Sequence, residues 1–188
     1  MNSIKSVKEA TIVDCPAVSI LMPVYNAVDT LHECIDSILS QSLQAFEVIA
    51  VDDFSTDDSV AILDSYDDPR IRVIENTEKG IVPALNKGLA SCRSDYVARM
   101  DADDVMYPRR LEKQLDAMIA DHSITLCATQ ARKFPEDIIK TGYVEYMRWQ
   151  NACISEQDIA NQIYIESPFA HPSVMFRKSR IDTPVSYT

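Results

Sequence analysis

Three aspartates, Asp101, Asp103 and Asp104, stand close together in the segment YVARMDADDVMYP (96–108). They follow an apolar run typical of a buried strand, although Asp is among the poorest strand formers. Carboxylates this close repel one another unless a positive charge lies among them. If the segment is extended, Asp101 and Asp103 point to one side and Ala102 to the other, so that two carboxylates share one target. The segment therefore predicts either a solvated turn or a cation site.

The chemistry of the ligands restricts the ion that such a site would hold. Carboxylate oxygens are hard ligands, and with no His or Cys nearby they suit magnesium or manganese better than zinc. Helix capping is the alternative explanation, because a helix is expected to begin near Pro108. Capping requires one Asp, however, and three are present.

Apolar runs and helical spacing alternate along the chain, which predicts the elements that position these aspartates. Strands bounded by helices in succession favour an α/β fold with a mainly parallel sheet and helices on both faces. The expected strands are residues 18–22, ended by Pro23, and residues 46–51, 71–74, 96–100 and 124–128. The helical spacing lies at Leu31, Ile35, Ile38 and Leu39, at Val60 and Leu63, at Ile81, Leu85 and Leu89, and at Leu111, Leu115, Met118 and Ile119.

In open sheets of this kind, ligands bind beyond the carboxyl ends of the strands. Three of these ends carry polar motifs: PVYN (23–26), DD (52–53) and DADD (101–104). We therefore expect the three motifs to converge in space. Asp57 and Asp58 are expected to cap the helix that follows the second strand.

The composition excludes several classes of function. The chain has 188 residues, is 46% hydrophobic, and has a net charge of -11, which disfavours nucleic acid or an anionic membrane as the main partner. With only three glycines, neither GxGxxG nor GxxxxGK[ST] can be written anywhere in the chain. Five cysteines without a CxxC pair indicate reduced thiols and favour neither a disulfide framework nor a zinc site.

No apolar run approaches the length of a membrane span, and the amino terminus does not resemble a signal peptide. The sequence therefore predicts a cytoplasmic protein without a transmembrane segment, with peripheral association with the inner face of a membrane as an alternative. The oligomeric state is not predicted.

Taken in order, the motifs resemble glycosyltransferase family 2. The segments that bear the resemblance are VSILMPVYNAVDTLHECIDSILSQSLQAFEVIAVDDFSTDDS, ENTEKGIVPALNKGLASCRSDYVARMDADDVMYPRRLEKQ and, at 171–178, HPSVMFRK. The resemblance implies a GT-A fold, a nucleotide-sugar donor, a divalent metal (Mn2+ or Mg2+), and sugar transfer with inversion. By analogy it also implies a carbohydrate or glycolipid acceptor in polysaccharide biosynthesis.

The resemblance also implies a division of the chain. Residues 1–17 would be an amino-terminal extension, and residues 18–130 the nucleotide-sugar-binding GT-A core. Residues 131–188 would be a partial acceptor-side region.

Site residues follow from the resemblance position by position. Pro23 and Tyr25 would lie against the nucleobase, and Asp53 would accept a hydrogen bond from it. Asp101 would approach the ribose or diphosphate and serve as a second metal ligand. Asp103 would be the main metal ligand.

Two further residues match the family pattern with their roles left open. Asn86, in ALNKG, is expected either near the donor or in support of the core. Arg99 is expected either to contact the donor or to offset the acidic cluster.

The family's general base usually lies some distance beyond the segment matched by HPSVMFRK, and this chain ends at Thr188. We therefore assign no catalytic base, and expect a chain shortened at its carboxyl end or a natural short form. A nucleotide-sugar binding module without catalysis is one alternative. A phosphohydrolase that uses Asp101 as nucleophile is another.

Fewer features are informative beyond residue 130. Ser155 and Asp158 predict the start of a helix. Trp149 is expected either to pack internally or to form a wall of the acceptor cleft. His171 is expected either to face the active site or to be a structural residue fixed by Pro172.

Overall fold

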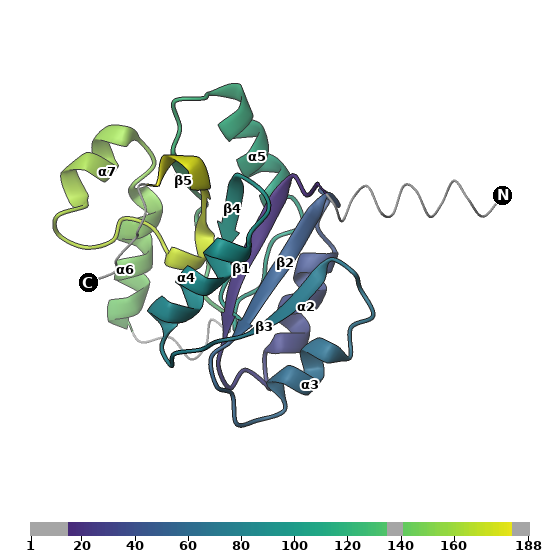
Figure 1. Cartoon of the computed structure of the whole chain (residues 1–188). Coiled ribbons are helices and arrows are strands. Elements are labelled where there is room, and N and C mark those ends of the chain that lie inside the picture. Colours follow the sequence, from purple (N-terminus) through teal and green to yellow (C-terminus); the bar gives the residue numbers. More distant parts are fainter. Residues whose placement is uncertain (1–14, 135–140, 182–188) are drawn as a thin grey trace.

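A six-stranded sheet in the order β3-β2-β1-β4-β6-β5 forms the centre of the molecule (Figure 1). The computed structural model describes residues 15–134 and 141–181. Strands β1 to β4 pair in parallel, whereas β6 runs antiparallel to both of its neighbours. The predicted mainly parallel α/β sheet is therefore confirmed. The strands are β1 Val18–Val24, β2 Phe46–Asp52, β3 Ile71–Glu75, β4 Tyr96–Arg99, β5 Leu126–Ala128 and β6 Val174–Arg177.

Helices cover both faces of the sheet. They are α2 Leu31–Leu39, α3 Ser59–Asp64, α4 Ile81–Ser91, α5 Arg110–Ala120, α6 Thr141–Ala152 and α7 Glu156–Gln162, with short 3-10 turns η2 His171–Ser173 and η3 Lys178–Arg180. Side chains alternate along each strand, so neighbouring residues face opposite layers. Ile20 and Met22 pack with α2, α3 and α5, whereas Leu21 packs with α4. Helices α6 and α7 lie on the side of the molecule that holds β5 (Figure 1).

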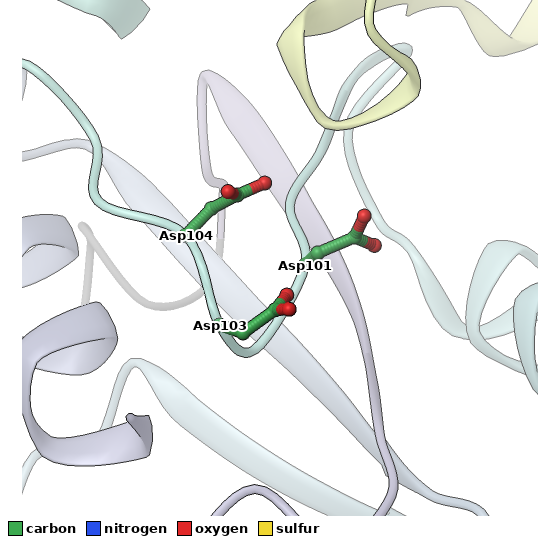
Figure 2. Close-up of side chains that lie close together, drawn as sticks. All are labelled: Asp101, Asp103 and Asp104. Carbon is green, nitrogen blue, oxygen red and sulfur yellow. The ribbon is translucent and has the colours of Figure 1, made fainter. Parts of the chain in front are cut away.

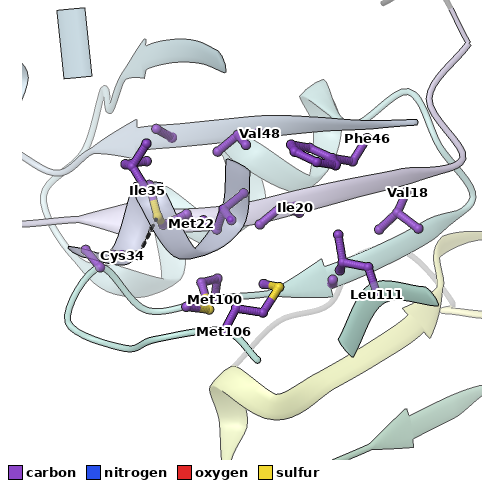
Figure 3. Packing of buried hydrophobic residues seen from close by; sticks show 14 of the residues in the cluster. Val18, Ile20, Met22, Cys34, Ile35, Phe46, Val48, Met100, Met106 and Leu111 are labelled. Carbon is purple, nitrogen blue, oxygen red and sulfur yellow. Dashed lines mark hydrogen bonds between the residues drawn. The ribbon is translucent and has the colours of Figure 1, made fainter. Parts of the chain in front are cut away.

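The larger core lies between the sheet and α2. Figure 3 shows Ile20 and Met22 of β1 and Val48 of β2 beside Cys34 and Ile35 of α2, and all five are fully buried. Continuous burial of β1 and β2 explains why both strands are mostly apolar.

On the opposite face, α4 packs closely against the strands at Gly88. A Cβ atom at this position would lie 2.2 Å from Leu21 Cδ1 and 2.8 Å from Val51 Cγ2. The absence of a side chain thus allows the helix to approach the sheet, as is common where backbones lie close together.

Two details of the fold differ from the prediction. Strand β1 continues through Pro23, which stays paired with Val51 of β2. The pairing of β1 with β4 already ends at Leu21, so the missing N–H of Pro23 leaves no gap in the ladder on that side. Strand β6 was not predicted: its four residues insert between β4 and β5.

The predicted caps have mixed outcomes. Asp57 Oδ1 accepts a hydrogen bond from the Ser59 N–H at 3.0 Å, whereas Asp58 makes no side-chain cap although it occupies the N-cap position. The predicted start of α7 is confirmed, because Ser155 and Asp158 form a reciprocal capping box.

All five cysteines are free thiols, as predicted. Among the described residues, no helix is long and apolar enough to span a bilayer.

Candidate functional site

Residues 101–104, which we call the acid turn, gather three carboxylates immediately after β4 (Figure 2). The Asp104 N–H donates to the Asp101 carbonyl at 3.2 Å, and oxygens of Asp101, Asp103 and Asp104 lie within 4.8 Å of one another. The expected extended alternation is wrong, because β4 ends at Arg99 and the chain then turns. The turn brings in Asp104 as a third carboxylate, which was not among the predicted metal ligands.

Contacts from the start of α2 hold the acid turn in place. Thr30 Oγ1 donates to the Ala102 carbonyl at 3.0 Å, and the Cys34 thiol lies 3.4 Å from the Asp101 carbonyl. Ala102 itself is buried. Burial raises the pKa of Cys34 to about 12, with the nearby aspartates adding to the effect, so this thiol stays protonated.

The three carboxylates differ in their partners. Arg99 forms a two-pronged ion pair with Asp101, with Nη2–Oδ1 at 2.8 Å and Nη1–Oδ2 at 3.1 Å. Burial nevertheless raises the pKa of Asp101, opposed by Arg99 and reinforced by Asp103. Burial, together with the charges of Asp101 and Asp103, raises the pKa of Asp104 to about 6. Asp103 is exposed, and its carboxylate forms no hydrogen bond or ion pair with another described residue.

Helix capping does not explain these aspartates. The N-cap residue of α5 is Arg109, and no side chain caps the helix. The alternative interpretation of Asp103 and Asp104 as caps is therefore wrong.

The end of β2 is fixed by Asp53. Its Oδ1 accepts hydrogen bonds from the Gly80 N–H and from Asn76 Nδ2, both at 2.8 Å. Gly80 has φ +133°, a conformation that residues with side chains rarely adopt. The Asp53 N–H donates to the Val24 carbonyl at 2.8 Å. Asp53 thus ties the loop after β3 to the ends of β1 and β2.

The loops after β1 and β2 are bonded to each other. Asn26, in a left-handed conformation with φ 49°, accepts a hydrogen bond from the Thr56 N–H at 2.8 Å through Oδ1. Its own N–H donates to Ser55 Oγ at 3.1 Å. Tyr25 beside it is half-exposed, with Lys79 Nζ 5.0 Å from the ring centroid. The Tyr25 ring therefore belongs to a loop that hydrogen bonds from the neighbouring loop hold in place.

All three strand ends meet around one cavity of about 590 Å³, as expected from the sequence. Of the predicted site residues, the structure brings together Pro23, Tyr25, Asp53, Asp101 and Asp103 in its wall. The other residues of the wall are Val24, Asn26, Ala27, Asp29, Thr30, Ile81 and Ala102.

Two predicted site residues lie elsewhere. Asn86 is exposed on α4 and belongs to the wall of neither large cavity, so the structure supports neither its donor role nor its role in the core. Arg99 lines a second cavity and pairs with Asp101, which matches the charge-offsetting alternative.

The second cavity, of about 840 Å³, adjoins the first and shares Asp101 and Asp103 with it. His171, Tyr143 and Tyr146 line it, whereas Trp149 does not. The Trp149 ring packs against Tyr146 with centroids 5.7 Å apart, and its Nε1 donates to Gln162, which agrees with the packing interpretation.

A polar pair on α5, which was not predicted from the sequence, supports the end of β4 just before the acid turn. Buried Arg110 donates from Nη2 to the carbonyls of Arg99 (2.9 Å) and Val174 (3.2 Å), and from Nε to Gln114 Oε1 (3.0 Å). Burial lowers the pKa of Arg110 to about 10. The available signal was the spacing of four between Arg110 and Gln114 beside an apolar helix face.

The chain is similar to known proteins in sequence and in fold. The family described as "Glycosyl transferase family 2" matches residues 19–182. The putative glycosyltransferase EpsE of Bacillus subtilis is 35% identical over 176 residues, which are 92% of this chain and 60% of EpsE. The amylovoran biosynthesis glycosyltransferase AmsE of Erwinia amylovora is 32% identical over 174 residues, covering 90% of this chain and 63% of AmsE. The chain thus spans about three-fifths of these relatives.

Solved structures share the fold at lower identity. Residues 1–349 of TarS from S. aureus, in complex with UDP, align with a TM-score of 0.66 and 21% identity, over 86% of this chain and 47% of that one. The mannosyltransferase PcManGT from Pyrobaculum calidifontis, in complex with GDP-Man and Mn2+, aligns with a TM-score of 0.62 and 20% identity, over 93% of this chain and 51% of that one. These similarities support the predicted GT-A fold. With this fold and the family match over residues 19–182, the chain belongs to glycosyl transferase family 2.

Proposed function

We propose that this chain forms the donor-binding part of a transferase that moves a sugar from a nucleoside diphosphate to an acceptor hydroxyl, with inversion at the anomeric carbon. The main support is the convergence of three polar strand ends on one cavity of about 590 Å³, a size typical of small-molecule sites. The fold neighbours in complex with UDP and with GDP-Man support a nucleotide-sugar as the ligand class. The names of the relatives, which include a chondroitin synthase of Escherichia coli, support an acceptor in polysaccharide biosynthesis.

The nucleobase would lie at the ends of β1 and β2. Tyr25 would offer its ring face to the base, with Pro23 beside it, because an aromatic ring provides a large apolar contact. Asp53 would accept a hydrogen bond from a base N–H. Its carboxylate is already oriented by Gly80 and Asn76, so little ordering would be needed when the donor binds.

The acid turn has the chemistry of a site for Mn2+ or Mg2+. Three carboxylates with oxygens within 4.8 Å of one another, and neither His nor Cys among them, form a hard donor set. Asp103 would be the first metal ligand, because its carboxylate has no hydrogen bond or ion pair with another described residue. Asp101 would be the second ligand, although Arg99 already binds both of its oxygens. A bound divalent ion stabilises the negative charge that develops on a departing diphosphate.

In the proposed reaction, the acceptor oxygen forms a bond to the anomeric carbon while the bond from that carbon to the phosphate oxygen breaks. The electron pair leaves with the nucleoside diphosphate, and the hydroxyl proton passes to a base. Inversion requires the acceptor to approach from the face opposite the leaving group. The 840 Å³ cavity that adjoins Asp101 and Asp103 would admit the acceptor. We assign no base.

Calorimetry with UDP, GDP and dTDP, each with and without manganese, tests the donor and metal parts of this proposal. We expect one nucleotide to bind in a manganese-dependent manner, and Asp103→Asn to weaken that binding at least about 10-fold. Asp116→Asn is the matched control, because Asp116 is exposed on α5 and lies in neither cavity wall. If no nucleotide binds, or if Asp103→Asn binds as tightly as the control, the donor and metal assignments are wrong.

Release of nucleoside diphosphate from donor sugars separates a transferase from a binding module. Release that depends on an added acceptor supports transfer, whereas manganese-dependent binding without any release supports the module. The alternative that Asp101 is a phosphohydrolase nucleophile is disfavoured, since Arg99 engages both of its oxygens and the family match is to transferases.

A further inference from the structure

The two cavities that share Asp101 and Asp103 differ sharply in charge. The described residues that line the 590 Å³ cavity include four carboxylates (Asp29, Asp53, Asp101 and Asp103) and neither Lys nor Arg. The described residues that line the 840 Å³ cavity include six Lys or Arg side chains (Arg99, Arg109, Arg110, Lys113, Arg132 and Lys133) and four carboxylates (Asp101, Asp103, Asp104 and Glu166), so cations are in excess there. In a chain with a net charge of -11, this concentration of positive charge on one side of the acid turn requires an explanation.

Some of these cations already have structural roles. Arg99 pairs with Asp101, and buried Arg110 donates to backbone carbonyls. Arg109 Nε lies 3.0 Å from Glu112. These three explain part of the positive charge without any ligand.

Lys113 and Lys133 are not neutralised by a carboxylate within the part of the chain that the structure describes. Both are exposed, and within residues 15–134 and 141–181 neither forms an ion pair with a carboxylate. Lys113 lies on α5 one turn beyond Arg109, so the two share a helix face. Lys133 Nζ lies 4.0 Å from the centroid of the Tyr143 ring, which also lines the cavity. Lys133 thus contacts the Tyr143 ring, and no described carboxylate pairs with either ammonium group.

An exposed lysine beside an aromatic ring suits a sugar that bears an anionic group. The part of the ring that the lysine does not cover would offer an apolar contact to the pyranose, and the ammonium group would bind an oxyanion as a point charge. The acceptor hydroxyl must still reach Asp101 and Asp103, so the anionic group would lie away from the reacting oxygen.

We propose that the acceptor is an anionic carbohydrate, bearing phosphate or carboxylate groups that bind Lys113 and Lys133. This inference rests on the proposed function, because it assigns the 840 Å³ cavity to the acceptor. It adds to that function the charge of the acceptor, about which the family match gives no information. A free oligosaccharide and a lipid-linked one would present the same oxyanion chemistry.

Binding and turnover with matched probes test the proposal. The probes are a glucuronate-containing tetrasaccharide, a polyol-phosphate oligomer and a neutral tetrasaccharide, each titrated in the presence of manganese and the nucleotide that binds. We expect at least about 10-fold tighter binding of an anionic probe than of the neutral one, and a loss of this preference as salt is raised from 50 to 300 mM. Vesicles of phosphatidylglycerol and of phosphatidylcholine, with a lipid-linked oligosaccharide in each, distinguish a membrane source from a free one.

The variants Lys113→Glu and Lys133→Glu locate the effect. Each should raise the Kd, or the KM where transfer is observed, for the anionic probe about 10-fold and leave nucleotide affinity unchanged. Arg180→Glu is the control, because Arg180 is exposed in η3 and lies outside the cavity wall. This substitution changes the net charge by the same amount as Lys113→Glu or Lys133→Glu.

Equal binding of neutral and anionic probes, or equal effects of all three charge reversals, would overturn the anionic acceptor. That result is separable from failure of the proposed function, which would appear as the absence of manganese-dependent nucleotide binding in the wild-type protein.

Discussion

Glu47 of β2 is a buried carboxylate near the end of the sheet opposite the acid turn. Its side chain is 1% exposed and accepts hydrogen bonds from Ser19 Oγ at 2.7 Å, from the Arg93 N–H at 2.8 Å and from Arg93 Nε at 2.7 Å. Arg72 adds a contact at 3.2 Å. These residues lie on β1, β2 and β3 and in the loop before β4, so Glu47 joins the amino-terminal ends of the parallel strands.

The partners of Glu47 predict a pH-dependent contribution to stability. Burial alone would raise the pKa of Glu47, but the hydrogen bonds from Ser19 and Arg93 lower it below its ordinary value. Since the folded pKa lies below the unfolded one, the stabilisation is fully present above the ordinary glutamate pKa and is lost as pH falls through the folded value.

We expect Glu47→Gln to lower the free energy of unfolding by about 2 kcal/mol at pH 7. The difference from the wild type should shrink progressively below pH 4.5. Urea denaturation of both proteins from pH 7 down to the acid transition measures it. A difference that stays constant over this range would show that the charge of Glu47 is not what stabilises the sheet.

At the scale of elements, α5 connects the acid turn to the edge of the sheet. Arg110 on its first turn binds the carbonyls of Arg99 and Val174. Gln114, one turn later, donates from Nε2 to the Ser173 carbonyl at 3.0 Å and to the Cys127 carbonyl at 3.2 Å. One helix therefore fixes the ends of β4, β5 and β6 relative to one another, and both cavities depend on that arrangement.

Gln114→Leu should destabilise the fold by about 2 to 3 kcal/mol. The substitution keeps a similar volume but leaves buried Arg110 Nε without its acceptor and removes one donor each from the Ser173 and Cys127 carbonyls, of which Ser173 keeps the Thr129 N–H at 3.2 Å. An unsatisfied buried donor on a charged group is costly. Thermal and urea denaturation measure the change. Gln157→Leu on the exposed surface of α7 is the matched control and should change stability by less than about 0.5 kcal/mol. Equal effects of the two substitutions would contradict the bracing role of Gln114.

At the scale of the whole molecule, the region beyond residue 130 shares a sheet with the region before it. Strand β6 pairs with β4 through Tyr96↔Arg177, Val97↔Phe176 and Ala98↔Met175, and it is the pairing partner of β5. Val174 and Met175 are both buried, and Met175 belongs to the same core as β1 and β2. The segment 171–181 thus contributes to the architecture as well as to the cavity wall.

A chain that ends after residue 130 should therefore lose cooperative folding. Removing the buried Val174 and Met175 alone costs about 3 to 6 kcal/mol, a large part of the stability of an ordinary domain. The loss would also leave β5 unpaired and expose the edge of β4, which favours aggregation. Circular dichroism during thermal unfolding, with light scattering, compares residues 1–130 with the full chain. An unchanged melting temperature would mean that residues 18–130 fold independently.

Much of the fold was predictable because its signals are local. The strands β1 to β4 and the helices between them follow from apolar periodicity within a few residues of each position, and their alternation implies a parallel sheet. Strand β6 was missed, because four residues between η2 and η3 have too short a pattern to indicate a strand. Its antiparallel place between β4 and β5 depends on pairing with residues distant in the chain.

The sequence by itself determined that aspartates lie at the carboxyl ends of β2 and β4. Each strand and the aspartates that end it form one continuous segment, so both are visible in the local sequence. Only the tertiary structure decided that residues 101–104 turn and bring Asp104 to Asp101 and Asp103, and that Asn86 lies in the wall of neither cavity. It also decided that Lys113 and Lys133 line one cavity. Such proximity arises from the packing of α5, β5 and β6 against β4, and no local period in the sequence encodes contacts between segments so far apart.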